Sequence, residues 1–118
     1  MLDRQSLGWA HCMVISKNHA PQVFQLDDET YSALFSLAKR LAPALLIATG
    51  ERAVGFVAFG SGLPHAHLHL VPHSQSDVLF NPRAYIRDLD EKMLEENAER
   101  LRPHLQAMQG LTLPIIRR

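Results

Sequence analysis

Apolar residues recur along this chain in two patterns, which predict strands and helices. Short, mostly apolar runs at residues 10–15 and 54–59 are typical of strands. A third strand is expected to begin at Pro64 and to end near Pro72, because hydrophobic residues alternate there with polar ones. Between these runs, apolar residues are spaced three or four positions apart, which is the helical spacing.

The first predicted helix follows Asp27 or Asp28. Either carboxylate can cap a helix by accepting hydrogen bonds from the free amides of its first turn. The apolar stripe of this helix consists of Tyr31, Leu34, Phe35, Ala38, Leu41 and Ala42. Pro43 is expected to end or kink the helix. A continuation would reach Gly50, which is a suitable residue for a C-terminal cap.

A second helix is predicted after Asp88 or Asp90, with Pro103 disturbing its last turns. Its apolar stripe contains Met93, Leu94, Ala98 and Leu101. The composition of residues 74–82 is typical of a loop. The apolar residues 111–116 form a β-prone tail whose role the pattern does not define.

These elements fit a single α+β domain spanning residues 1–118. A length of 118 residues with 47% hydrophobic content suits one compact domain with its own core. The sequence contains no repeat, low-complexity tract or linker that would divide it.

Charge and cysteine content exclude several classes of protein. The 12 basic and 12 acidic residues give a net charge of zero, whereas nucleic-acid binders usually carry a basic surplus. The single cysteine, Cys12, excludes an internal disulfide and is expected to be a small core residue. The apolar runs are too short for a membrane span, and the first residues lack a signal-peptide pattern. We therefore expect a cytoplasmic protein without nucleic-acid or membrane partners.

The candidate chemistry lies in the strand that contains His65, His67 and His69. Residues two apart in a strand share a face, so the three imidazoles should form one row, about 6.5–7 Å apart. The intervening apolar residues, Ala66, Leu68 and Leu70, should face the core. A row of three titratable rings on an otherwise apolar strand indicates a functional site.

Two chemistries suit such a row. Histidines two apart on a strand can hold a zinc ion, but no acidic residue follows closely until Asp77, and the other histidines are isolated. The alternative is nucleophilic attack on phosphorus by a neutral imidazole, with neighbouring rings donating hydrogen bonds to the phosphoryl oxygens. We favour the second chemistry, which needs no metal and no cofactor.

The segment from His65 to Val71 resembles the signature of the histidine triad family. In that signature three histidines alternate with hydrophobic residues and two further hydrophobic residues follow, and all seven positions conform here. Residues 10–19 are similar to an earlier strand of the family, and Leu26–Glu29 with the apolar stripe is similar to its helix. The resemblance covers residues 2–72, whereas residues 73–118 form a loop, a helix and a tail.

The resemblance implies a small antiparallel sheet of about four to five strands, a main helix packed on it, a second C-terminal helix, and a homodimer. It also implies a hydrolase or nucleotidyl transferase that acts at the α-phosphate of a nucleotide conjugate. Nucleoside phosphoramidates and dinucleoside polyphosphates are the implied small-molecule substrates. The reaction would pass through a nucleotidyl group bound covalently to histidine.

The resemblance also assigns roles to individual residues. His67 would be the nucleophile, and its other ring nitrogen would donate to a backbone carbonyl, which fixes the reactive tautomer. His69 and His11 would contact the phosphate oxygens, and His65 would orient the nucleophile. Asp3, eight residues before His11, would bind the ribose hydroxyls.

The glycine-rich turn before the triad is a second candidate for nucleotide binding. Gly60 and Gly62 could present backbone amides to a phosphate. Ser61 is the candidate for the serine that helps the leaving group in the phosphoramidase branch. Two other hypotheses remain open: a non-catalytic nucleotide-binding module, and a metal protein that uses the face carrying the three histidines.

Overall fold

The computed structural model describes residues 2–3, 5–58 and 64–107. In chain order, its strands are β1 (Gln5–Ser6), β2 (Cys12–Ile15), β3 (Ala53–Val57), β4 (His67–His73) and β5 (Arg87–Asp88). Its α-helices are α1 (Asp28–Thr49), α2 (Asp77–Phe80) and α3 (Glu91–Gln106), and short 3-10 helices occur at Val23–Gln25 and Pro82–Ala84. The α+β prediction is confirmed.

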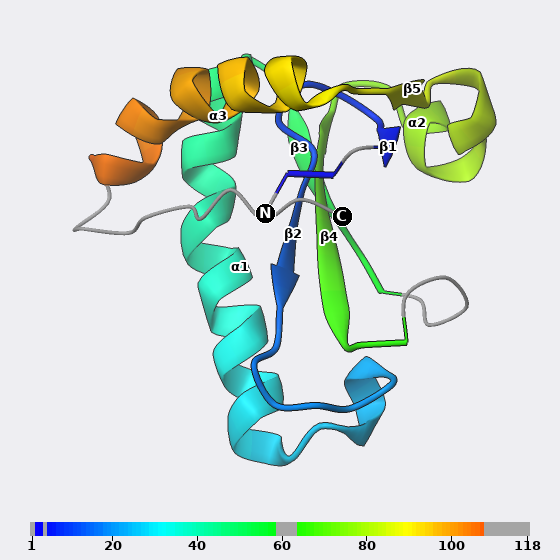
Figure 1. The fold of residues 1–118 in the computed structure, drawn as a ribbon, viewed down its shortest axis with the longest axis vertical. Coiled ribbons are helices and arrows are strands. Elements are labelled where there is room, and N and C mark those ends of the chain that lie inside the picture. Colours follow the sequence, from blue (N-terminus) through cyan, green and yellow to red (C-terminus); the bar gives the residue numbers. More distant parts are fainter. Residues whose placement is uncertain (1, 4, 59–63, 108–118) are drawn as a thin grey trace.

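The strands form two antiparallel sheets. The larger sheet has the order β2-β4-β3, so the histidine strand β4 lies at its centre (Figure 1). The smaller sheet pairs β1 near the N-terminus with β5, which is distant in sequence. The five strands of the described residues agree with the expected number, but they are divided between two sheets.

Helix α1 begins and ends as the cap residues predict. The Asp27 side chain accepts a hydrogen bond from the Thr30 amide at 2.7 Å, and Gly50 takes the left-handed conformation with φ of 71°. Pro43 does not end the helix: α1 continues as far as Thr49 with Gly50 as its cap, which is the continuation that the sequence allowed. Pro43 is exposed, whereas Leu41 and Leu45 on either side of it are buried in the core, so packing holds the two halves together.

The C-terminal half is more regular than its composition suggests. Residues 74–82 are not purely loop, because α2 forms there around the buried Val78. Helix α3 is capped by Asp90, whose side chain accepts from the Met93 amide at 2.9 Å. Pro103 lies within α3, which extends to Gln106. The apolar tail at residues 111–116 lies outside the described residues.

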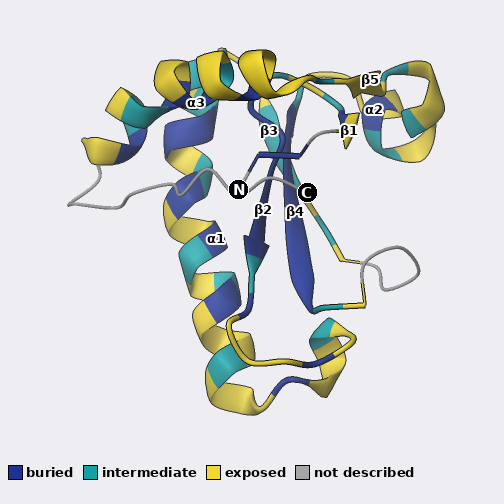
Figure 2. Ribbon diagram, viewed as in Figure 1, coloured by how far each residue is buried: buried dark blue, intermediate teal, exposed yellow. Residues whose placement is uncertain are grey.

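The core lies between the larger sheet and the two long helices. Figure 2 shows buried positions along β2 and β4 and in stripes on α1 and α3. The central strand supplies Leu68 and Leu70, which are 1% and 0% exposed. The helices supply Leu34, Ala38, Leu41, Ala44 and Leu45 from α1 and Leu94, Ala98, Leu101 and Leu105 from α3. The predicted inward face of the histidine strand is therefore confirmed, with its polar face on the other side.

Among the described helices, α1 is long and apolar enough to cross a membrane by length and composition alone. Core helices pass the same test, and the inward residues of α1 pack in the core. Only 28% of its most apolar window is buried, and Ile47 is 75% exposed. The exposed positions of α1 are mixed, since Ser32, Ser36, Lys39 and Arg40 are exposed together with Ile47.

Candidate active site

Strand β4 positions two of the three triad histidines, and the segment before it positions the third. The strand begins at His67, so the prediction that it opens at Pro64 is wrong. The preceding Ala66 is instead tied to the loop after β2: its amide donates to the Ala20 carbonyl at 2.7 Å, and its carbonyl accepts from the Ser16 amide at 3.2 Å. His65 therefore lies just outside the regular row.

The tautomer of His67 follows from its backbone contact. Its Nδ1 lies 2.8 Å from the His65 carbonyl oxygen, which can only accept, so Nδ1 carries the proton. The Nε2 atom then holds a lone pair, which is the state that a nucleophile needs. The contact between the nucleophile's second nitrogen and a backbone carbonyl, which the resemblance implied, is therefore present.

His67, His69 and His11 form a continuous row of ring contacts. The Nε2 atoms of His67 and His69 lie 3.1 Å apart, and His69 Nδ1 lies 2.9 Å from His11 Nε2. At the far end the Leu7 amide donates to His11 Nδ1 at 3.0 Å. Met13 pairs with His69 across the sheet, which brings the beginning of β2 beside the triad.

The two ends of this row determine every proton position within it. His11 Nδ1 accepts from the Leu7 amide, so Nε2 of His11 must be protonated and must donate to His69 Nδ1. His69 then carries its proton on Nε2 and donates it to the lone pair of His67. In this arrangement all three rings are neutral, and the His67 lone pair is occupied by His69.

Asp3 lies against this row, although the sequence suggested a different partner for it. Its Oδ1 accepts from the Gln5 amide at 3.1 Å, and its Oδ2 lies 3.5 Å from His69 Nδ1 and 3.7 Å from His11 Nε2. The Asp3 amide donates to the His11 carbonyl at 3.1 Å, which fixes the residue beside β2. The carboxylate is 2% exposed. Sequence analysis found no acidic residue close to the triad because Asp3 is distant in the chain and reaches it only through folding.

His65 contacts a different group. Its Nε2 hydrogen-bonds to the Ser16 carbonyl oxygen, and its ring lies edge-on to His19 with centroids 5.5 Å apart. The structure therefore joins His11 and Asp3 to His67 and His69, and it places His65 at the other end with His19. Gly60, Ser61 and Gly62 lie outside the described residues, so their contacts stay predictions.

The rings of the site are buried, but a cavity reaches His67. His67 is 2% exposed and His69 is 6% exposed. The cavity has a volume of about 270 Å³ and is lined by Phe24, Tyr31, Phe35, Ala58, Ala66 and His67, among others. Its aromatic walls suit a flat apolar group such as a nucleobase.

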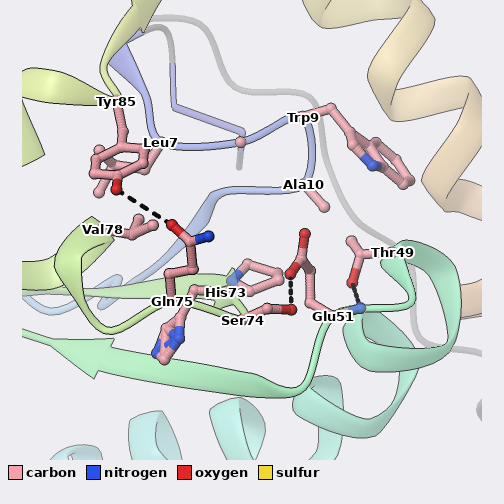
Figure 3. A pocket seen from close by; sticks show the side chains of 12 residues that line it. Leu7, Trp9, Ala10, Thr49, Glu51, His73, Ser74, Gln75, Val78 and Tyr85 are labelled. Atoms are coloured by element: carbon pink, nitrogen blue, oxygen red, sulfur yellow. Dashed lines mark hydrogen bonds between the residues drawn. The ribbon is translucent and has the colours of Figure 1, made fainter.

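A larger cavity of about 450 Å³ lies at the other end of β4 (Figure 3). Its lining includes Trp9, Glu51, Ser74, Gln75 and Tyr85. The Ser74 hydroxyl donates to the Glu51 carboxylate, and the Tyr85 hydroxyl lies 3.4 Å from Gln75 Oε1. The Glu51 carboxylate makes this cavity a poor place for an anionic group.

Comparison with known proteins agrees with this geometry. The HIT domain family matches residues 1–76. Adenylylsulfatase HINT3 of Arabidopsis thaliana is 26% identical over 85 residues, which cover 68% of this chain but only 43% of that protein.

In fold the chain is similar to a hypothetical histidine triad nucleotide-binding protein of Sulfolobus tokodaii, with a TM-score of 0.74 and 19% identity. The similarity covers 92% of this chain and 80% of that chain. It is also similar to a Hit-like protein involved in cell-cycle regulation from Bartonella henselae, with a TM-score of 0.73, 20% identity and coverage of 88% and 77%. The matched region includes the whole histidine row together with Asp3, and the chain belongs to the HIT domain family.

Proposed function

We propose that this protein is a hydrolase or nucleotidyl transferase that acts at the α-phosphate of a nucleotide conjugate, with His67 as the nucleophile. The observation that carries the proposal is the bond from His67 Nδ1 to the His65 carbonyl, because it leaves Nε2 unprotonated. Membership of the HIT domain family and the name of the Arabidopsis relative support the same class of reaction.

In the proposed reaction, the incoming phosphate displaces the contact between His69 and His67. The Nε2–H of His69 then turns from the His67 lone pair to a phosphoryl oxygen. His67 Nε2 attacks the α-phosphorus, the bond to the leaving group breaks with its electron pair going to the leaving group, and the leaving group takes up a proton from solvent. Water, or another acceptor in a transfer reaction, next attacks the phosphorus and gives up a proton to solvent. His67 leaves with the electron pair of the nitrogen–phosphorus bond, and a nucleoside monophosphate or its transfer product is released.

Asp3 would support the row electrostatically during this step. Attack through Nε2 leaves positive charge on the His67 ring, while His69 donates to the phosphoryl oxygens on which negative charge builds up. The buried Asp3 carboxylate, 3.5 Å from His69 Nδ1, favours positive charge within this row of rings. This position argues for an electrostatic role of Asp3, whereas its predicted contact with ribose would require the buried carboxylate to turn toward the nucleotide.

The substrate classes that we propose are nucleoside phosphoramidates and dinucleoside polyphosphates. The printed name of the Arabidopsis relative adds adenylyl sulfate as a third conjugate to examine. The chain spans less than half of that relative, so its substrate is carried over only as a candidate. The three conjugates share an adenylyl group and differ in the leaving group.

The test compares wild type with His67→Asn on all three conjugates. We expect turnover of at least one conjugate by wild type and a loss of more than about a thousandfold in kcat/KM in the variant, as is usual for a covalent nucleophile. Brief exposure of wild type to substrate should also yield a nucleotidyl adduct on His67 by mass spectrometry. His104→Gln, a change on α3, is the matched control and should retain the wild-type rate.

Two results would contradict the covalent mechanism: retained turnover in His67→Asn, or turnover with an adduct on another residue. If wild type and variant are equally inert while both bind AMP, the protein is instead a non-catalytic nucleotide-binding module. The burial of His67 and its contact with His69 are the features that favour this second candidate.

We also propose that the protein is a homodimer. Strand β3 is at the edge of the larger sheet, and its Phe56 is 42% exposed. Toward the C-terminal end of α1, Ile47 is 75% exposed and Pro43, one turn before it, is exposed as well. Edge strands and apolar faces of this kind are commonly covered by a second subunit.

A further inference from the structure

The larger cavity, at the end of β4 opposite His67, has a lining that suits a cation (Figure 3). Its volume of about 450 Å³ lies within the range of small-molecule sites. No lysine or arginine belongs to its lining among the described residues, whereas Glu51 contributes a carboxylate. We propose that this cavity binds a small organic cation, a primary amine or guanidine on an apolar stem, which pairs with Glu51.

The Glu51 carboxylate has no basic partner among the described residues. It accepts a hydrogen bond from the Ser74 hydroxyl, and none of the ion pairs between described residues includes it. The side chain is half-buried, so water and salt screen its charge less than they would at an open surface. A carboxylate in this setting gains most from a cation that brings its own hydrogen-bond donors.

The hydroxyl groups of the lining already donate within the protein. Ser74 donates to Glu51, and Thr49 donates to a carbonyl in the preceding turn of α1 at 2.7 Å. The Tyr85 hydroxyl donates to Gln75 Oε1 at 3.4 Å. These hydroxyl groups therefore have no proton left to bind an anion, and their oxygen atoms favour a ligand with N–H donors.

His73 adds a nitrogen atom that lacks a partner. Its Nδ1 is buried and has no hydrogen-bond partner among the described residues, although buried polar atoms normally have one. Because no bond holds the ring at this atom, a turn of the side chain would bring it to a ligand in the cavity that His73 lines. The unprotonated nitrogen of a neutral imidazole accepts a hydrogen bond, so a ligand N–H group would satisfy it.

The remaining side chains of the lining suit the stem of such a ligand. Four of them are apolar: Leu7, Ala10, Pro72 and Val78. Trp9 and Tyr85 add aromatic rings, whose faces attract cations. The Arg100 guanidinium already lies 4.0 Å over the Trp9 ring, so we expect the ligand cation to use Tyr85.

The cavity also contacts the segment that orients His11. Leu7 and Gly8 line it. The Leu7 amide donates to His11 Nδ1 at 3.0 Å, and the Gly8 carbonyl accepts from the His11 amide at 3.1 Å. A ligand in the cavity would therefore touch backbone groups that hold the end of the histidine row, which gives the binding test a local readout.

The test uses three probes of similar size and different charge: phenethylamine, 2-phenylethanol and phenylacetate. Trp9 is the only tryptophan of the chain, so its fluorescence reports binding at this cavity. We expect saturable binding of the amine, binding of the alcohol that is weaker by about tenfold or more, and no binding of the acid, because charged hydrogen bonds are the stronger ones. In amide NMR spectra, the amine should shift the signals of Leu7 and Gly8.

Two variants remove the partner of the cation in different ways. Glu51→Gln deletes the charge, and Gln75→Lys supplies the cavity with an ammonium group of the protein itself. Each should weaken phenethylamine binding by about tenfold or more, and if one variant fails to fold the other decides. Glu29→Gln is the matched control, because Glu29 is an exposed acid in the first turn of α1 and is not part of the lining.

Four results would overturn the proposal. Wild type may bind no phenethylamine, or it binds 2-phenylethanol as tightly as the amine. Both folded variants bind the amine as wild type does, or Glu29→Gln weakens binding as much as Glu51→Gln. Shifts of amide signals that leave Leu7 and Gly8 unchanged would likewise place the amine outside this cavity and overturn the assignment.

Discussion

At the scale of single residues, backbone groups decide the tautomer of His67, the proposed nucleophile. The Leu7 amide at one end of the histidine row and the His65 carbonyl at the other admit only one set of neutral tautomers. In these tautomers His67 Nε2 has a lone pair, and this lone pair accepts a hydrogen bond from His69 Nε2–H. Removal of this contact by a bound phosphate would then create the nucleophile only when substrate is present.

A second residue-scale consequence concerns Cys12, which is 1% exposed at the beginning of β2. Burial raises the pKa of its thiol from 9.0 to about 11. In the unfolded chain the thiol ionises from pH 9, whereas in the folded protein it stays neutral until about pH 11. The contribution to stability is therefore complete below pH 9 and is lost as the pH rises toward 11.

We predict that this loss amounts to roughly 2–3 kcal/mol by pH 11, since one pKa unit corresponds to about 1.4 kcal/mol. Urea unfolding between pH 8 and 11 should show it in wild type but not in Cys12→Ala, although the alanine variant will be less stable throughout. If the free energy of unfolding falls equally with pH in wild type and in Cys12→Ala, ionisation of Cys12 does not cause the loss of stability.

At the scale of elements, hydrogen bonds outside the strand ladder position the triad. Strand β4 aligns His67 with His69, but the bonds between Ala66 and residues Ser16 and Ala20 set where the strand begins. His65 is consequently released from the row, and its carbonyl becomes the acceptor for His67. A longer strand would have used that carbonyl for pairing.

Helix α1 offers a prediction at the same scale. Hydrogen bonds from the side chain and the backbone amide of Thr30 lower the pKa of Asp27 below 3.8. Such a group stabilises the fold above its unfolded pKa, and the stabilisation is lost as the pH falls through the lower folded value. Asp27→Ala should lower Tm at pH 7, and the difference from wild type should shrink in strong acid.

Two variants control this measurement by thermal unfolding. Asp28→Ala removes a first-turn acid that is not the cap and should change Tm much less. Asp27→Asn retains a capping oxygen without a charge, so it should keep most of the stability at pH 7 and show less dependence on pH. An equal loss in Asp27→Ala and Asp28→Ala would mean that the helix dipole, and not the cap, explains the effect.

At the scale of the whole molecule, the C-terminal third holds the N-terminal segment on the site. Strand β5 pairs with β1, and the Arg100 guanidinium on α3 lies 4.0 Å over the Trp9 ring. These contacts flank Leu7, whose amide orients His11. Residues beyond the recognisable motif therefore support the histidine row, although none of them belongs to it.

Subunit association is the prediction that belongs to this scale. Phe56→Lys on the edge strand β3 and Ile47→Glu on α1 should each convert a dimer to a monomer in light scattering, because each places a charge on an apolar surface. Phe80→Lys is the matched control, since Phe80 is 85% exposed and belongs to α2, which is part of neither proposed surface. A monomeric wild type would disprove the homodimer, and a dimer that survives the first two changes would place the interface elsewhere.

The sequence by itself determined the local features of this protein. The alternation from His65 to His69 predicted that the three rings share a face, because side-chain direction in a strand follows from its two-residue period. The resemblance of His65 to Val71 to a family signature indicated the family, which the family match confirms, and His67 as the candidate nucleophile. The caps at Asp27, Gly50 and Asp90 were also readable, since each depends on groups only a few residues away. Whether the helix would end at Pro43 or continue to Gly50 stayed open in the sequence, because the local penalty of proline is opposed by packing that the sequence does not display.

Only the tertiary structure decided which groups surround His69. Asp3 and the Leu7 amide reach the histidine row through the pairing of chain segments that are far apart, and no periodicity records such contacts. The division of the strands into two sheets and the exit of His65 from the row have the same origin. Local spacing places His67 and His69 on one face of a strand. Long-range contacts decide the distances between the rings, the positions of their protons and the presence of the Asp3 carboxylate beside them.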